Sequence, residues 1–143
     1  MKKIFLLLLL VLFVSNVQAQ HFGEPWTSEQ LMTTATLASK MKRNQMQQTI
    51  VINIGPDALI KYSHHIGPTN NPENLEKLKD FLATISKNKE VVLYCGCCPF
   101  DICPNIRPAF QLLMDAGFLK GKLLDIPKNI KTDWIAKGYP VKE

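Results

Sequence analysis

Cysteine is missing from this sequence everywhere except in one short segment. The chain has 143 residues and four cysteines, and all four lie between Cys95 and Cys103. Small disulfide-rich domains usually spread their cysteines along the chain, and a bridge inside so short a loop stabilises little because it closes little chain. The clustering therefore favours chemistry, metal binding or redox pairing, with two structural disulfides as the alternative.

The sequence also has no apolar run long enough to span a bilayer. The longest run, Ile4–Val14, has 11 residues, whereas a membrane-spanning helix needs about 20. It follows a basic start and precedes small residues at Val17 and Ala19, which is the pattern of a secretory signal peptide. We expect cleavage after Ala19, with residues 1–19 as signal peptide and residues 20–143 as one periplasmic or secreted domain. An uncleaved membrane anchor is the less favoured alternative.

A basic stripe of the kind that binds nucleic acid is not found either. The formal net charge is +5, and removal of Lys2 and Lys3 with the signal peptide leaves 15 basic and 12 acidic residues, a charge of +3. The basic residues are scattered, so we expect no nucleic-acid partner. After cleavage of the signal peptide we also expect no association with a membrane. Internal repeats, low-complexity segments and linkers are missing too, and the remaining length suits a single hydrophobic core.

What the chain does contain is an alternation of helical and strand patterns. This alternation predicts an α/β fold with a mostly parallel sheet, and the continuous apolar strands fit a sheet that is covered on both faces. Residues 58–62 are expected to form a helical turn, and residues 63–71 are rich in turn formers. The expected helices cover residues 28–39, 72–86, 107–116 and 130–137, and the expected strands cover residues 49–54, 91–94 and 122–126.

The cysteine segment joins one of these strands to one of these helices. The strand at residues 91–94 ends on Cys95, and a helix opens at Arg107 and Pro108. Loop amides and the positive end of a helix dipole stabilise an anion, so a cysteine placed there has a lowered pKa. We predict that Cys95 is a nucleophile and that Arg107 binds an anionic substrate.

The other three cysteines allow two interpretations. Cys103 can pair with a neighbouring cysteine as a resolving disulfide. Alternatively, Cys97, Cys98 and Cys103, with or without Cys95, can hold a soft ion such as Cu(I) or Zn(II). The spacing C-x-C-C-x4-C is not a standard zinc-finger spacing, so both interpretations stay open.

Four segments carry a family resemblance: residues 50–54, 65–68, 91–95 and 124–141. In that order they resemble the strand before an Asp-Val-Arg segment, a Gly-His-Ile-Pro-Gly-Ala stretch, the strand ending on the catalytic cysteine, and the closing strand, helix and Gly-Leu-Pro-Val tail of single-domain rhodaneses. The resemblance covers roughly residues 25–141 and implies a three-layer α/β fold with a mostly parallel central sheet between helices.

The same resemblance implies a sulfurtransferase without a cofactor. A persulfide on Cys95 would carry sulfane sulfur from an anionic donor such as thiosulfate to a thiol acceptor, which can be a protein thiol. Under this interpretation His64 and His65 pack the structure and stay outside the site.

Three departures from the family pattern concern the site. Asn53 and Gly55 stand where the family usually has Asp and Arg, and Phe100 stands five residues after Cys95, where the family usually has an arginine. The loop after Cys95 is longer than the family's active loop. This predicts either a larger pocket for the substrate or a set of thiols presented to a partner. The alternative function is therefore a periplasmic thiol-disulfide or Cu/Zn-binding protein that uses the four cysteines on a rhodanese fold. A binding module with its cysteines locked as disulfides is a third interpretation.

Overall fold

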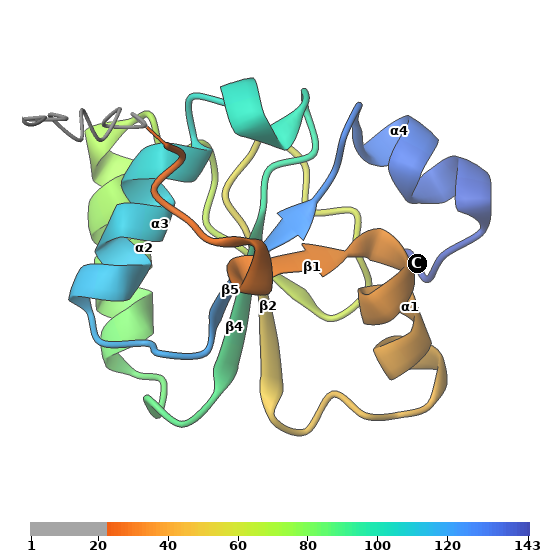
Figure 1. Cartoon of the computed structure of the whole chain (residues 1–143), viewed down its shortest axis with the longest axis horizontal. Helices are drawn as coiled ribbons and strands as arrows, with labels where there is room; N and C mark the ends of the chain where they lie inside the picture. The colour runs from red at the N-terminus through yellow and green to blue at the C-terminus, as the bar shows by residue number, and fades with distance from the viewer. Residues whose placement is uncertain (1–22) are drawn as a thin grey trace, which may run out of the picture.

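The computed structural model describes residues 23–143, so the expected signal peptide of residues 1–19 lies outside the described residues. The middle layer is a five-stranded sheet in the order β1-β5-β4-β2-β3, and all of its strand pairs are parallel (Figure 1). The strands are β1 (Leu31–Thr33), β2 (Thr49–Asn53), β3 (Ser63–His65), β4 (Glu90–Tyr94) and β5 (Gly121–Asp125). The helices are α1 (Thr34–Lys42), α2 (Pro72–Ala83), α3 (Ile106–Asp115) and α4 (Ile130–Asp133), with short 3-10 turns η1 (Ser28–Gln30), η2 (Phe100–Ile102) and η3 (Ile135–Lys137).

Helices cover both faces of the sheet, as predicted. In Figure 1, α2 and α3 lie on one side, and α1 and α4 lie on the other. Because side chains alternate along a strand, Val91 and Leu93 of β4 pack into the core with α2 and α3, whereas Val92 and Tyr94 pack into the core with α1 and Trp134. The protein is therefore a three-layer α/β fold with its central strand buried on both faces.

The expected helix over residues 28–39 is confirmed for residues 34–39, which belong to α1, and is wrong for residues 28–33. The amide of Thr27 does donate to Oε1 of Gln30 over 2.9 Å, but this contact begins the short turn η1. Leu31 and the next two residues then pair with β5 as the strand β1, and α1 starts only after Thr33, whose hydroxyl accepts from the amide of Thr36. Pairing with β5 overrides the local helical pattern at residues 31–33, and Leu37 of α1 is fully buried in the core.

The segment between β2 and α2 also differs from expectation. Residues 58–62 form no helical turn, since Ile60 pairs with Val141 in an isolated antiparallel bridge. Part of the expected turn region is the strand β3, which is paired with β2. Its polar sequence gives no apolar signal, and the pairing is supported by the buried hydroxyl of Tyr94, which contacts Ser63 Oγ over 3.0 Å.

The remaining elements are confirmed with small shifts at their ends. Asn71 caps α2 and Pro72 occupies its first turn, but α2 ends at Ala83 rather than near residue 86. The last expected helix is divided into α4 and η3, and it stops at Gly138 in the left-handed conformation. Within residues 23–143, we find no helix with the length and apolarity needed to cross a membrane.

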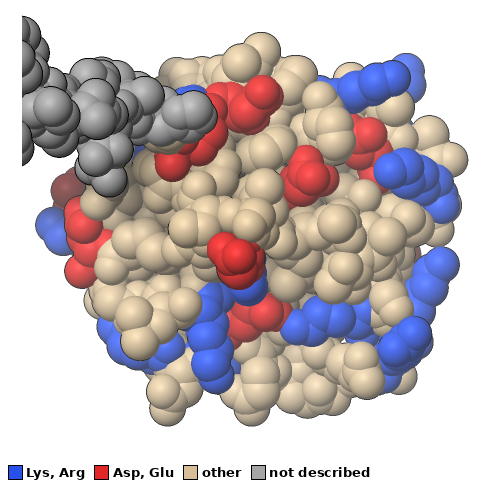
Figure 2. All heavy atoms as spheres, viewed as in Figure 1, with Lys and Arg blue, Asp and Glu red and all other residues tan. Residues whose placement is uncertain are grey.

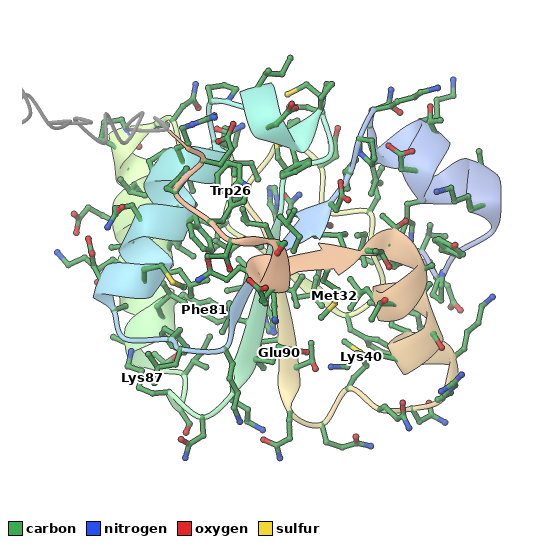
Figure 3. All side chains as sticks on the ribbon, viewed as in Figure 1. Trp26, Met32, Lys40, Phe81, Lys87 and Glu90 are labelled. Carbon is green, nitrogen blue, oxygen red and sulfur yellow. The ribbon has the colours of Figure 1, made fainter. Side chains whose placement is uncertain are left out.

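The chain before η1 lies against α3 and the cysteine loop. Trp26 is 8% exposed, and its ring lies 5.9 Å from Phe110 and 5.8 Å from Phe100 between centroids. Figure 3 labels Trp26 beside α3. At the amino-terminal ends of the strands, Lys40 of α1 pairs with Glu90 at the start of β4 (Figure 3). On the face shown in Figure 2, basic side chains lie mainly along the lower and right margins, with acidic side chains among them.

Candidate functional site

The candidate site lies at the carboxyl edge of the parallel sheet. Cys95 directly follows β4, and its neighbours at this edge are Asn53 at the end of β2 and His65 at the end of β3. Open α/β sheets place their sites at this edge. The side chain of Cys95 is 3% exposed, so the sulfur lies just beneath the surface.

Asn53 holds the backbone at Cys95 in place. Its Nδ2 donates to the carbonyl of Cys95 over 3.3 Å and to the carbonyl of Asp57 over 3.1 Å, and its Oδ1 contacts Nδ1 of His65 over 2.9 Å. The side chain is completely buried. A carboxylate at this position would face two carbonyl acceptors without a proton to donate, so an amide suits this position better than the aspartate of the rhodanese pattern.

Gly55 leaves room for the sulfur itself. A Cβ atom at this position would lie 2.6 Å from the carbonyl oxygen and 2.7 Å from Sγ of Cys95. Both distances are far below van der Waals contact, so any larger residue would displace the cysteine. The arginine of the rhodanese pattern at this position would therefore have no space in this site.

Asn105 is a site residue that sequence reasoning missed. It occupies the N-cap position of α3, but its side chain makes no capping bond. Instead, its Nδ2 lies 3.3 Å from Sγ of Cys95 and 3.8 Å from Sγ of Cys103, and its Oδ1 accepts from the amide of Asn70. An asparagine directly before a helix normally indicates a cap, and only the fold shows that this one contacts sulfur.

The four cysteines all have free thiols, and the structure brings them together. Sγ of Cys97 lies 3.2 Å from Sγ of Cys95 and 3.3 Å from Sγ of Cys98. The sulfurs of Cys95, Cys97 and Cys103 all lie within 4.8 Å of one another. Cys95 and Cys103 are buried, whereas Cys97 is exposed.

The pKa values of the clustered thiols differ from the sequence-based expectation. The pKa of Cys95 is raised rather than lowered, first by its hydrogen bond with Cys103 and then by burial, although the Cys97 amide and Asn105 act in the opposite direction. Burial, followed by contact with the neighbouring thiol, raises the pKa of Cys97 and of Cys98 as well. Neighbouring protonated thiols and low solvent access outweigh the donors that the loop supplies.

The loop that carries the cysteines is fastened at several points. The carbonyl of Gly96 accepts from the amide of Ile130 over 2.8 Å, and the amide of Phe100 donates to the carbonyl of Ile126 over 3.1 Å. Gly96 itself has a φ of +87°, a conformation that favours glycine. These contacts fasten the loop to the segment after β5, so the thiols are held in position before a substrate binds.

Arg107 lies at the start of α3, but its guanidinium points toward the N-terminal part of the chain. It pairs with Glu24, donates to the carbonyl of Asp101 over 2.7 Å and lies 5.3 Å from the ring of Trp26. None of the contacts found for this guanidinium within residues 23–143 reaches a cysteine. The structure thus brings Cys95 together with the other cysteines. Arg107 is near them in the sequence, but its guanidinium does not contact them.

The two histidines have packing contacts. The ring of His64 lies 4.8 Å from that of Phe81, and His65 contacts Asn53, which in turn holds the carbonyl of Cys95. His65 is therefore two hydrogen bonds from the cysteine backbone, which the sequence did not indicate.

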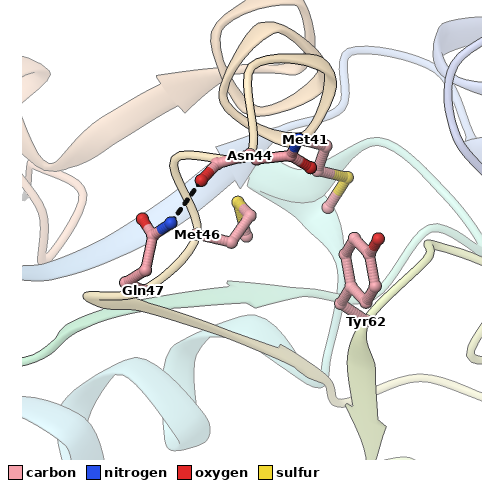
Figure 4. A pocket seen from close by; sticks show the side chains of 5 residues that line it. All are labelled: Met41, Asn44, Met46, Gln47 and Tyr62. Atoms are coloured by element: carbon pink, nitrogen blue, oxygen red, sulfur yellow. Dashed lines mark hydrogen bonds between the residues drawn. The ribbon is translucent and has the colours of Figure 1, made fainter.

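A hollow of about 230 Å³ lies elsewhere (Figure 4). It is lined by Met41, Asn44, Met46, Gln47 and Tyr62. Gln47 and Tyr62 closely precede β2 and β3, so this hollow lies toward the amino edge of the sheet. It is separate from the cysteine cluster at the carboxyl edge.

Comparison with known proteins adds structural relatives only, since no family model and no curated protein matches the sequence. The BH2092 protein of Bacillus halodurans matches with a TM-score of 0.60 and 21% identity, over 80% of this chain and 77% of that one. The single domain sulfurtransferase RDL2 of Saccharomyces cerevisiae matches with a TM-score of 0.55 and 17% identity, over 79% and 95%.

A third similar structure is that of a variant of EanB, which matches with a TM-score of 0.56 and 14% identity. The match covers 78% of this chain and 27% of that one, and the structure holds ergothioneine covalently linked with a persulfide cysteine of that protein. At these identities the likeness concerns the fold. Together with the parallel five-stranded sheet between two helical layers, it establishes that this chain has the rhodanese-like fold.

Proposed function

We propose that this protein is an exported sulfurtransferase that carries sulfane sulfur on Cys95. The observation that supports this most is the position of Cys95 at the end of the central strand, with the Asn105 amide 3.3 Å from its sulfur. The likeness to a single domain sulfurtransferase agrees with this function. Export is inferred from residues 1–19, and the mature domain of residues 20–143 would act in the periplasm or outside the cell.

The proposed reaction has two displacement steps. The thiolate of Cys95 attacks the outer sulfur of an anionic donor such as thiosulfate, the sulfur–sulfur bond of the donor breaks, and sulfite leaves with the electron pair. A thiol acceptor, which can be a protein thiol, then attacks the outer sulfur of the Cys95 persulfide. Cys95 leaves as a thiolate, and the acceptor becomes the persulfide.

The raised pKa of Cys95 lowers the thiolate fraction at neutral pH but does not abolish the chemistry. Among thiolates, intrinsic nucleophilicity rises with pKa, so each thiolate that forms is more reactive. The amides of Asn105 and Cys97 are the groups that favour the Cys95 anion once the proton has left.

The first prediction concerns the nucleophile. Cys95→Ser should abolish thiosulfate-dependent formation of thiocyanate from cyanide, because a serine hydroxyl is not ionised at neutral pH and cannot form a persulfide. Steady-state thiocyanate assays on purified mature protein check this, with Cys98→Ser as the matched control that retains activity. Equal activity of Cys95→Ser and wild type would remove Cys95 as the sulfur carrier.

The second prediction concerns pH. Because the pKa of Cys95 lies above its ordinary range, the thiolate fraction is still increasing at alkaline pH. The value of kcat/KM for thiosulfate should therefore rise by about tenfold per pH unit between pH 7 and 9 without levelling off. A plateau below pH 8 in the pH–rate profile would show a lowered pKa instead.

The third prediction concerns Arg107, which we propose binds the anionic donor after its pairing with Glu24 opens. Arg107→Ala should raise KM for thiosulfate and leave kcat nearly unchanged, because the charge contributes to binding rather than to sulfur transfer. Glu24→Gln should act in the opposite direction, since it frees the guanidinium. Identical dependence on thiosulfate concentration in all three proteins would exclude this role.

The close group of three sulfurs favours a second candidate function, which is the binding of Cu(I) or Zn(II), with or without thiol-disulfide exchange. Thiolates bound to one tetrahedral ion at about 2.3 Å stand roughly 3.8 Å apart, and the sulfurs of Cys95, Cys97 and Cys103 span a similar range. The group differs from the sets expected from sequence in leaving out Cys98. A soft ion would deprotonate these thiols despite the raised pKa values of Cys95 and Cys97.

The fourth prediction tests this candidate directly. Under this function, protein purified without chelators should retain about one ion per chain by elemental analysis. Cys103→Ser should lose the ion and Cys98→Ser should keep it. Metal-free protein that still forms a persulfide would exclude the metal function and leave the sulfurtransferase.

A further inference from the structure

We propose that Cys97 is a second sulfur carrier, which takes the outer sulfur from the Cys95 persulfide and presents it at the surface to a large thiol acceptor. This inference rests on the proposed sulfur transfer by Cys95. A mechanism with a single cysteine gives Cys97 no role. Here Cys97 passes sulfur to thiol acceptors that are too large to reach Cys95.

Cys95 is buried, which limits the acceptors that can reach it. Its side chain is 3% exposed, and its sulfur lies among Gly55, Cys103 and Asn105. A small anion or cyanide needs little space to reach this sulfur, but a thiol on a peptide or protein brings a bulky backbone with it. Burial therefore shields a persulfide on Cys95 from large acceptors more strongly than from small ones.

Cys97 connects this buried sulfur to solvent. Its side chain is exposed, and its Sγ lies 3.2 Å from Sγ of Cys95. The intervening Gly96 is held in a left-handed conformation, and its carbonyl is bonded to Ile130. Because a persulfide bond is about 2.05 Å long, the outer sulfur on Cys95 would stand within reach of Cys97.

The transfer balances without an outside oxidant or reductant. The thiolate of Cys97 attacks the outer sulfur of the Cys95 persulfide, the sulfur–sulfur bond at Cys95 breaks, and Cys95 leaves with the electron pair as a thiolate. A proton passes from the Cys97 thiol to Cys95, and the persulfide now resides on Cys97. The acceptor thiol then takes the outer sulfur from Cys97 in the same manner.

The other two cysteines are less suited to this role. Cys103 is fully buried and offers no route to solvent. Cys98 is partly buried, and its Sγ lies 3.3 Å from Sγ of Cys97. Cys97 is thus the thiol that combines contact with Cys95 and exposure.

The experiment compares wild type, Cys97→Ser and the matched control Cys98→Ser, each reduced and then loaded with thiosulfate under anaerobic conditions. Loaded protein is mixed either with cyanide, a small acceptor, or with reduced glutathione, a bulky thiol. Mass spectrometry of the cysteine peptide follows which residue holds the extra sulfur over time. Because Cys97 is exposed, its replacement by serine should leave the fold intact, which circular dichroism verifies.

We expect wild type to show the extra sulfur on Cys95 and then on Cys97. Cys97→Ser should still load sulfur on Cys95 and deliver it to cyanide, but its transfer to glutathione should be lost. Cys98→Ser should behave as wild type with both acceptors.

Three outcomes would overturn the relay while leaving Cys95 as carrier. The first is transfer to glutathione by Cys97→Ser at the wild-type rate. The second is failure of Cys97→Ser to load sulfur, since Cys97 would then be the point of entry. The third is release of sulfide from wild type with formation of a Cys95–Cys97 disulfide. Failure of wild type itself to load sulfur would instead overturn the proposed function, and the relay with it.

Discussion

The burial of β4 between two layers of helices is the constraint on which the site depends. Its side chains pack alternately into the two cores, so the strand has no freedom to slide or rotate. Pairing with β2 on one side and β5 on the other fixes its register. The residue that follows the strand, Cys95, is therefore placed at the carboxyl edge of the sheet by the packing of the whole domain.

Around that fixed cysteine, the residues that depart from the family pattern form a consistent set. Asn53 stands where the rhodanese pattern has an acid, and it donates to two carbonyls; Gly55 stands where that pattern has an arginine, and the Cys95 sulfur fills the space beside it. In place of a ring of charged or amide donors, the longer loop surrounds the sulfur with other thiols and with Asn105. The site therefore favours chemistry among sulfur atoms over strong activation of one thiolate.

Sequence patterns predicted the elements that have a strong local signal. The apolar strands β2, β4 and β5 and the capped helix α2 were predicted because burial on both faces and capping leave clear traces. The strands β1 and β3 were missed because each depends on pairing at an edge of the sheet, and Ser63–His65 carries no apolar pattern. At the site, adjacency in the chain identified the cysteine cluster. The contact of Asn105 and the raised pKa of Cys95 arise from tertiary packing, which no local pattern encodes.

Intact-mass spectrometry of the mature protein tests the central claim, that Cys95 is a sulfur carrier, most directly. The protein is reduced, freed of reductant and incubated anaerobically with thiosulfate. Sulfur carriage by Cys95 should add one sulfur, about 32 Da, which a reductant removes and which Cys95→Ser does not show. An unchanged mass, or a loss of two hydrogens per cysteine pair with no added sulfur, would contradict it.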